Sequence, residues 1–348
     1  MIRLPHKKLI GRRGRDTLRR MSRHALWIGL AAVMLFAVSA AAKVKHPLPS
    51  FRFQALAGDT FPELTILESD FGGDRVRFAY VPAAVSEQSA QALIASVPAT
   101  PPQELTLQEG GRTFKYSAVG DLSKPAKAIV VYVHGFAADR LQGVGEKQFG
   151  GNFARLTRLI AANDAIYLSP DFSGFGREAE AEIGGLIADY AGRSPGAPVF
   201  VACVSYGGSL CWRLAEDAGS SSPLRGILVF GAPVDRAFLK HIGANPLHVY
   251  VGIGTKDAFA SWKSADDFFR DVKNAADGYP IRLAIFDQGE HATAVRLTDW
   301  VEVLNWMVPG DNNAGGQPVT PAAATGQPCP RPRPSPQGRT LPSYCGTQ

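Results

Sequence analysis

The sequence predicts an α/β fold: a mostly parallel sheet with helices on both faces. Short apolar, β-branched runs recur from residue 128 onward, and segments of helical periodicity separate them. The runs are almost wholly apolar, as is typical of parallel strands covered on both sides. Polar or Gly-containing turns follow several runs, at the carboxyl ends where parallel sheets carry their ligand-binding residues.

The expected elements follow one another in a regular order. An early pair of strands and a weakly helical segment are expected at 64–68, 75–81 and 86–95, and a hairpin at 104–109 and 112–119. The later strands are expected at 128–133, 165–169, 199–202, 226–230, 247–253 and 281–286. Helices are expected at 152–162, at 178–191, after Gly208, around Phe268 to Ala276, and around Leu297 to Leu304.

Composition divides the 348 residues into one large domain with appendages. We expect a signal peptide or membrane anchor at 1–42, an N-terminal extension at 43–102 that begins with a linker at 43–60, and a main domain at 103–308. Residues 309–348 are Pro-rich and predict a disordered tail. No large cap domain is expected, because the segment between the strands that end near Asp235 and begin near Leu247 is short.

The formal charge of +6 originates in the first residues of the chain. Residues 1–24 hold nine Lys or Arg and one Asp, a net +8, which leaves −2 for residues 25–348. A nucleic-acid-binding domain carries its basic residues on the folded surface, so we expect no nucleic-acid partner.

The basic start precedes an apolar run at 25–37 and the small residues Ala40 and Ala42. This order is typical of a signal peptide cleaved after Ala40 or Ala42, which predicts a periplasmic or secreted protein. The alternative is an uncleaved membrane anchor, since residues 25–42 carry no charge. Translation could start at Met1 or at Met21.

One stretch carries a specific chemical signal. The apolar run from Val199 is followed by a sharp turn at Ser205, Gly207 and Gly208 and then by a helix-forming segment. A serine between a buried strand and a helix resembles the nucleophile elbow of the α/β-hydrolase family, whose pattern is Gly-x-Ser-x-Gly. Cys203 stands here where the family usually has its first Gly. The resemblance covers residues 103–308 and implies a serine esterase or lipase-like enzyme.

The family's chain order of nucleophile, acid and histidine implies three site residues. Ser205 would be the nucleophile, His291 the general base and later the acid, and Asp257 the carboxylate that orients the imidazole. Asp235, at the end of the preceding strand, is the rival acid. The backbone N–H groups of Phe136 and Tyr206 would form the oxyanion hole, and no cofactor or metal is implied.

Four cysteines complete the chemistry visible in the sequence. Cys203 and Cys211 flank the serine turn, and we expect both to be buried small apolar residues. Cys329 and Cys345 could pair within the tail in an oxidising compartment. No cysteine or histidine spacing is typical of a metal site.

These observations predict an exported serine hydrolase that cleaves carboxylic esters, or thioesters, through an acyl-enzyme. The expected partner is a small-molecule or lipid-like ester, and a membrane is involved only through an uncleaved N-terminal segment. Two alternatives stay open: a non-catalytic binding protein on the same fold, and an acyltransferase.

Overall fold

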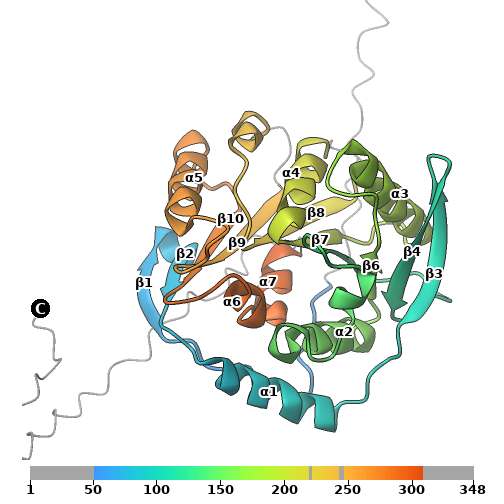
Figure 1. Cartoon of the computed structure of the whole chain (residues 1–348), viewed down its shortest axis with the longest axis horizontal. Coiled ribbons are helices and arrows are strands. Elements are labelled where there is room, and N and C mark those ends of the chain that lie inside the picture. The colour runs from blue at the N-terminus through green and yellow to red at the C-terminus, as the bar shows by residue number, and fades with distance from the viewer. Residues whose placement is uncertain (1–50, 219–221, 243–246, 309–348) are drawn as a thin grey trace, which may run out of the picture. The chain divides into compact units, whose positions relative to one another are not determined.

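A ten-stranded sheet forms the centre of the protein in the part that the computed structural model describes, residues 51–218, 222–242 and 247–308 (Figure 1). The strand order is β1-β2-β10-β9-β8-β7-β5-β6-β4-β3. All neighbours from β2 to β6 in this order are parallel. Strands β1, β4 and β3 join antiparallel at the two ends. The sheet is therefore mostly parallel, as the sequence predicts.

The strands are β1 (Ile66–Asp70), β2 (Arg75–Phe78), β3 (Gln103–Glu109), β4 (Arg112–Val119), β5 (Ile129–Val133), β6 (Ile166–Pro170), β7 (Val199–Val204), β8 (Leu224–Phe230), β9 (His248–Gly254) and β10 (Ile281–Phe286). The α-helices are α1 (Ala83–Ser96), α2 (Asn152–Ala162), α3 (Arg177–Arg193), α4 (Gly208–Glu216), α5 (Trp262–Ala275), α6 (Thr293–Arg296) and α7 (Trp300–Met307). Short 3₁₀ helices are η1 (Phe71–Gly73), η2 (Arg140–Gly143), η3 (Gln148–Gly151), η4 (Ser205–Gly207) and η5 (Arg236–Lys240).

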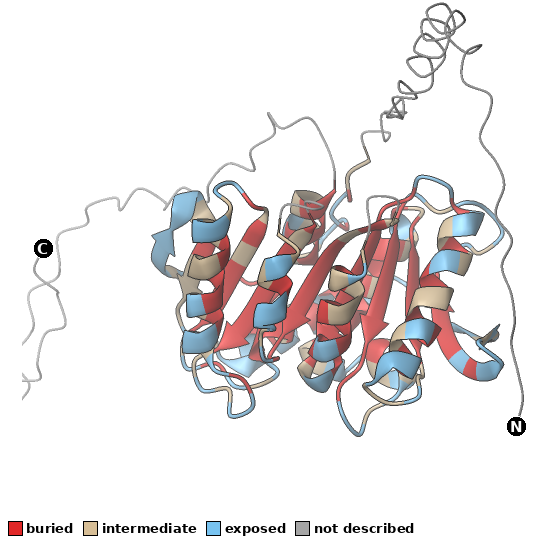
Figure 2. Cartoon of the chain, turned by 90° about the horizontal axis from the view of Figure 1, so that it is seen from above, coloured by how far each residue is buried: buried red, intermediate tan, exposed pale blue. Residues whose placement is uncertain are grey.

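Helices cover both faces of the sheet, and each face has its own apolar core. On one face α3, α4 and α5 pack around residues such as Trp212 and Phe268. On the other face α2, α6 and α7 pack around Phe153 and Trp300, and α1 lies against α2 (Figure 1). The helices bury the stripe that faces the sheet and expose the opposite stripe, as Figure 2 shows.

The closing helix expected around Leu297 to Leu304 is α7, which begins at Trp300, and the short helix α6 precedes it. The carboxylate of Asp299 accepts hydrogen bonds from the N–H groups of Val301 and Glu302, and so caps a new helix start. The apolar spacing begins before α7 because Leu297 is buried in the same core as Trp300 and Leu304.

The N-terminal residues belong to the same sheet. We expected residues 43–102 as an extension ahead of a domain at 103–308, with a linker at 43–60. Instead, β1 and β2 extend the sheet beyond β10, and the side chain of Arg75 in β2 is buried in an ion pair with Asp266 of α5. Phe53 is also buried, and its backbone bonds to the Asn305 side chain at both N–H and C=O. Residues 51–102 and 103–308 therefore share one sheet, and Phe53 belongs to the apolar core on the side of α2, α6 and α7.

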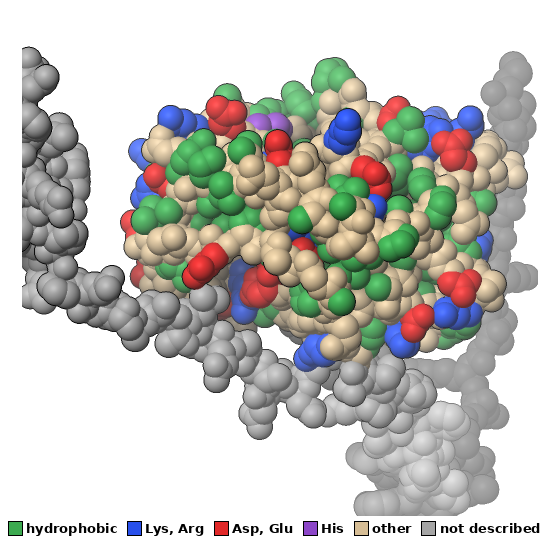
Figure 3. All heavy atoms as spheres, turned by 90° about the horizontal axis from the view of Figure 1, so that it is seen from below, with side chains coloured by type: hydrophobic (Ala, Val, Ile, Leu, Met, Phe, Trp, Pro, Cys, Tyr) green, Lys and Arg blue, Asp and Glu red, His purple; other side chains and the backbone are tan. Residues whose placement is uncertain are grey.

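The face seen from below Figure 1 carries Lys, Arg, Asp and Glu side chains interspersed with apolar ones (Figure 3). Among the described residues, no helix is both long enough and apolar enough to cross a membrane. The leader at 1–42, the tail at 309–348 and the cysteines Cys329 and Cys345 lie outside the described residues.

Candidate active site

Ser205 sits at the turn between β7 and α4 with a left-handed backbone. Every residue of β7 is buried, as expected of a central parallel strand. The chain then reverses at Ser205, whose φ is +57°. A non-glycine residue held at positive φ costs about 1–2 kcal/mol, and such strain persists where the surrounding structure fixes it. The turn thus presents the serine side chain at the carboxyl edge of the sheet.

Small residues are needed around this turn because other backbone lies against it. A Cβ atom on Gly207 would lie 2.7 Å from the carbonyl oxygens of both Val133 and His134. A Cβ atom on Gly135 would lie 3.0 Å from the Cβ of Ser205. The loop after β5 therefore packs directly on the serine turn, at a distance that only glycine permits.

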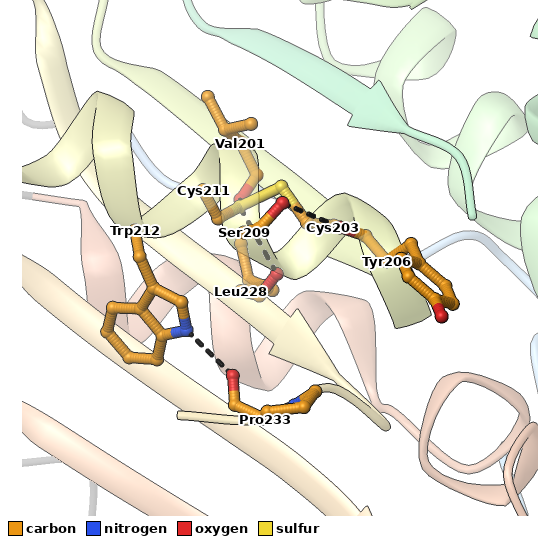
Figure 4. The surroundings of a disulfide bond; sticks show 8 residues. All are labelled: Val201, Cys203, Tyr206, Ser209, Cys211, Trp212, Leu228 and Pro233. Atoms are coloured by element: carbon orange, nitrogen blue, oxygen red, sulfur yellow. Dashed lines mark hydrogen bonds between the residues drawn. A yellow bond between two sulfur atoms is a disulfide. The ribbon is translucent and has the colours of Figure 1, made fainter. Parts of the chain in front are cut away.

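Cys203 and Cys211 form a disulfide, which corrects the expectation of two unpaired apolar side chains (Figure 4). Both residues are buried, as expected. The turn folds the first part of α4 back along β7, so that the two Cα atoms lie 6.1 Å apart, within bonding range. The cysteine in the family's glycine position is thus covalently joined to the helix that follows, and the bond spans the turn that carries Ser205.

Asp257 and His291 meet at the same edge of the sheet. Asp257 follows β9 and His291 follows β10, and Nδ1 of the imidazole lies 2.9 Å and 3.0 Å from the two carboxylate oxygens. The carboxylate is fully buried, whereas the imidazole is 39% exposed. The Oδ1 atom of Asp257 also accepts hydrogen bonds from the N–H groups of Phe259 and Ala260.

Two opposing effects set the acidity of Asp257. Burial raises the pKa of its carboxyl group, but the hydrogen bonds from His291, Ala260 and Phe259 outweigh burial and hold the pKa below its ordinary value. The side chain is therefore a carboxylate at neutral pH. It can fix the orientation of the imidazole and stabilise its protonated form.

The rival acid Asp235 does not contact His291. Its side chain is exposed and accepts a hydrogen bond from the N–H of Ala237, which caps η5. Of the two carboxylates that the sequence offers, the structure brings Asp257 to the histidine.

Gly231 lies between Ser205 and the Asp257–His291 pair. Val204 pairs with Phe230 in the register of β7 and β8, so Ser205 and Gly231 leave neighbouring strands side by side. A Cβ atom on Gly231 would lie 2.9 Å from Oδ2 of Asp257 and 3.1 Å from Nδ1 of His291. Strands β7, β8, β9 and β10 are consecutive in the sheet, so all three candidate residues gather at one edge.

The proposed oxyanion donors, Phe136 and Tyr206, flank the serine turn. Phe136 comes from the loop after β5 and Tyr206 from η4, and their ring centroids lie 5.6 Å apart. No side chain caps η4 or the start of α4, so capping does not occupy the N–H groups of this turn.

His134 supports the loop after β5 rather than reaching the serine. Its ring stacks on Phe172 with centroids 4.1 Å apart, and its Nδ1 lies 2.9 Å from the carbonyl oxygen of Gly135. Burial lowers the pKa of this imidazole, which favours the neutral form. Asp171 accepts hydrogen bonds from the backbone and side chain of Arg140 and so holds the far end of the same loop.

An ion pair that the sequence does not predict supports the loop that carries His291. Asp287, the first residue after β10, forms an ion pair with Arg77 of β2, and its N–H bonds to the carbonyl of Phe78 at 2.9 Å. No local pattern in the sequence indicates that residues so far apart are neighbours. Within the described ranges, no group of three or more His, Cys, Asp or Glu side chains is placed to hold a metal ion.

The sequence from residue 130 to residue 337 matches the model of the alpha/beta hydrolase family. This match spans more than half of the chain, and the chain belongs to this family. Membership supports a hydrolase as the class of protein. No curated protein sequence matches the chain.

Several solved structures resemble the fold at low identity. A predicted CIB-like hydrolase from Thermoplasma acidophilum is 16% identical, with a TM-score of 0.43 over 59% of this chain and 98% of that one. The esterase Pf2001 of Pyrococcus furiosus is 10% identical, with a TM-score of 0.46 over 59% and 88%. A cold-adapted esterase from an Arctic intertidal metagenomic library is 12% identical, with a TM-score of 0.46 over 60% and 94%. Likeness at this level carries no statement about substrate.

Proposed function

We propose that the protein is a serine hydrolase that cleaves carboxylic esters through an acyl-enzyme on Ser205. The observation that carries the proposal is the buried carboxylate of Asp257 bonded to Nδ1 of a half-exposed His291, at the sheet edge where Ser205 turns. A serine hydroxyl needs an oriented base to become a nucleophile, and this pair supplies one. Family membership supports the hydrolytic class.

In the first half of the reaction, Nε2 of His291 takes the proton of Ser205 as Oγ forms a bond to the ester carbonyl carbon. The N–H groups of Phe136 and Tyr206 stabilise the oxyanion, and the carboxylate of Asp257 stabilises the imidazolium. The bond from the carbonyl carbon to the alcohol oxygen then breaks, and His291 protonates the departing alkoxide. The products are an alcohol and an acyl-enzyme.

In the second half, His291 takes a proton from water while the water oxygen bonds to the acyl carbon. The bond from that carbon to Oγ of Ser205 breaks, and His291 returns the proton to the serine. The sum is ester plus water to carboxylic acid plus alcohol. Thioesters fit the same steps with a thiol leaving, whereas amides are poorer substrates because an amine leaves less readily.

The test is labelling with a fluorophosphonate, followed by a panel of esters. We expect the probe to modify Ser205, and Ser205→Ala to lose labelling and to lower turnover by about 10⁴–10⁶. Ser209→Ala is the matched control, because Ser209 lies in the first turn of α4 and its hydroxyl donates a hydrogen bond to the carbonyl oxygen of Tyr206. Labelling that persists in Ser205→Ala would contradict the assignment.

Two alternative functions on the same fold predict different results in these experiments. A non-catalytic binding protein would bind an ester without turnover and would not react with the fluorophosphonate. An acyltransferase would form the same acyl-enzyme but pass the acyl group to an added alcohol in preference to water. The ratio of transferred to hydrolysed product, measured with glycerol as acceptor, separates this case from a hydrolase.

We also propose that the protein is exported to the periplasm or secreted. The order of basic residues, apolar run and small residues in 1–42 supports this proposal, and so does the buried Cys203–Cys211 disulfide, since such bonds persist in oxidising compartments. We expect N-terminal sequencing of exported protein to begin at Ala41 or Lys43. A start at Met1 or Met21 would instead favour an N-terminal membrane anchor.

A further inference from the structure

Three aromatic side chains gather around Tyr206, beside the candidate active site. The ring centroid of Tyr206 lies 4.8 Å from that of Phe259, 5.6 Å from that of Phe136 and 5.7 Å from that of Phe175. We call Phe136, Phe175, Tyr206 and Phe259 the aromatic rim. The four residues come from four separate segments, the turn at Ser205 and the loops after β5, β6 and β9. These segments meet only at the carboxyl edge of the sheet.

Three of the four rim rings are open to solvent, in contrast to the core aromatic clusters of the described chain, and Phe175 is partly buried against the core. Phe136 is 72% exposed, Tyr206 48% and Phe259 38%. Large rings that pack together yet keep this much exposure contribute little to folding, because water still covers their outer faces. An exposed apolar group of this kind, placed at a reactive site, is typical of a surface that binds an apolar ligand.

The rim residues are attached to the catalytic groups by their backbones. Tyr206 directly follows Ser205, and Phe259 donates its N–H to Oδ1 of Asp257. The Phe259 ring also packs edge-on against the His291 imidazole, with centroids 5.5 Å apart. An ester carbonyl held over Ser205 would therefore have these rings beside one of its two substituents.

The arrangement of the rings favours a further aromatic ring over a saturated chain. The planes of Phe136, Phe175 and Phe259 are tilted by 49°, 46° and 35° to that of Tyr206, so the rim presents both ring faces and ring edges. Aryl groups gain edge-to-face and offset contacts with such surfaces beyond the gain from burying their area. A saturated ring of the same size gains the area alone.

Resting on the proposed esterase function, we propose that the aromatic rim is a subsite for an aryl group of the substrate, so that the enzyme prefers esters that carry an aromatic ring. The matched probes are methyl 3-phenylpropanoate and methyl 3-cyclohexylpropanoate, which differ only in the aromaticity of the ring. Methyl butanoate serves as the short reference ester. We expect kcat/KM for the phenyl ester to exceed that for the cyclohexyl ester roughly three- to tenfold.

The variants Tyr206→Leu and Phe259→Leu remove rim rings but keep the backbone donors. In each, we expect the phenyl-to-cyclohexyl ratio of kcat/KM to fall toward one. The ratio is the readout because any general damage to the catalytic step affects both esters equally. Phe71→Leu is the control. Phe71 is an exposed ring that packs on Phe269, and it precedes β2, so it lies toward the amino ends of the parallel strands. This control should keep the wild-type ratio.

Three outcomes would overturn the aryl subsite, and a fourth would overturn the esterase function on which it rests. Equal kcat/KM values for the two ring esters, together with hydrolysis of methyl butanoate, would reject the aryl subsite and leave the esterase proposal standing. A phenyl-to-cyclohexyl ratio of kcat/KM that falls toward one in Phe71→Leu would also reject the aryl subsite. Activity confined to esters in vesicles would reject it too, and would identify the rim as a lipid-docking surface. No hydrolysis of any ester and no fluorophosphonate labelling would reject the esterase function itself.

Discussion

Cys203 is bonded to Cys211 across the turn that carries Ser205. The bond joins the end of β7 to the first part of α4, and both sulfur atoms are buried in the core on one face of the sheet. The Sγ atom of Cys211 also lies 3.5 Å from the carbonyl oxygen of Val201 (Figure 4). A serine held at positive φ needs fixed surroundings, and a covalent link between strand and helix contributes to them.

Removing this bond should lower stability. We expect Cys203→Ala/Cys211→Ala to lose about 2–3 kcal/mol, because cross-linking a loop of this length restricts the unfolded chain by that amount. The measurement is a melting curve under non-reducing conditions. The matched control is Cys329→Ala/Cys345→Ala, which alters two cysteines beyond the end of α7 and should leave the midpoint unchanged. Equal midpoints for both double variants would show that the buried bond does not stabilise the protein.

Exchange of Asp257 for Asn should nearly abolish turnover. An amide at this position can donate to Nδ1 of His291 and so favours the wrong tautomer, while it no longer stabilises the imidazolium. We expect a fall in kcat of about 10⁴. Asp235→Asn is the control, because Asp235 caps η5 and does not contact His291. The two variants are compared by steady-state kinetics on one ester. A larger fall in kcat for Asp235→Asn than for Asp257→Asn would place the catalytic acid after β8 instead.

The pair formed by Arg77 and Asp287 should make stability depend on acidity. The hydrogen bond from the Arg77 guanidinium lowers the pKa of the Asp287 carboxyl group below its unfolded value, which is about 3.9. The folded protein then binds fewer protons than the unfolded chain at this site. The stabilisation is therefore fully present above pH about 4 and is lost as the pH falls through the folded pKa.

Arg77→Gln tests this dependence. We expect the variant to be less stable than the wild type by about 1–2 kcal/mol at pH 7, with a difference that shrinks below pH about 4. Arg193→Gln removes an exposed ion pair with Asp189 and should change stability by less than about 0.5 kcal/mol. The measurement is a series of melting curves from pH 7 to pH 3. A stability difference between wild type and Arg77→Gln that stays constant across that range would contradict the role given to the Arg77–Asp287 pair.

The sequence was most informative where structure is set by neighbouring residues. The buried strands β5, β7 and β10 are short apolar runs, and α2 has the expected bounds of residues 152–162 because its apolar face repeats at helical spacing. The candidate site residues came from the resemblance to the nucleophile elbow and from the chain order of that family. Once the strands were placed, Ser205, Asp257 and His291 each fell at a strand end, and parallel strands bring such ends together.

The features that the sequence did not predict depend on contacts between distant segments. β2 pairs with β10 across some two hundred residues, and no local pattern encodes that neighbour. The Cys203–Cys211 bond follows from the angle at which α4 leaves β7, which spacing alone does not give. The aromatic rim combines rings from four loops, so its members look unrelated in the sequence.

The last prediction concerns Gly231, which separates the serine from the acid–histidine pair. Its φ is +52°, and a Cβ atom there would lie 2.9 Å from Oδ2 of Asp257 and 3.1 Å from Nδ1 of His291. Gly231→Ala must therefore move the carboxylate, the imidazole or both. Misplacement of catalytic groups on the ångström scale costs about 10² in rate, so we expect kcat to fall by that order and KM to change less.

Gly278→Ala separates this steric effect from backbone strain. Gly278 also has a positive φ, +77°, but a Cβ atom there meets nothing within 4 Å. Both variants carry the strain of alanine in the left-handed region, about 1–2 kcal/mol, so both should melt at lower temperature. Only Gly231→Ala should lose turnover per active site, with active sites counted by fluorophosphonate titration. A fully active Gly231→Ala enzyme would mean that the Asp257–His291 contact tolerates displacement, and that its geometry does not limit the reaction.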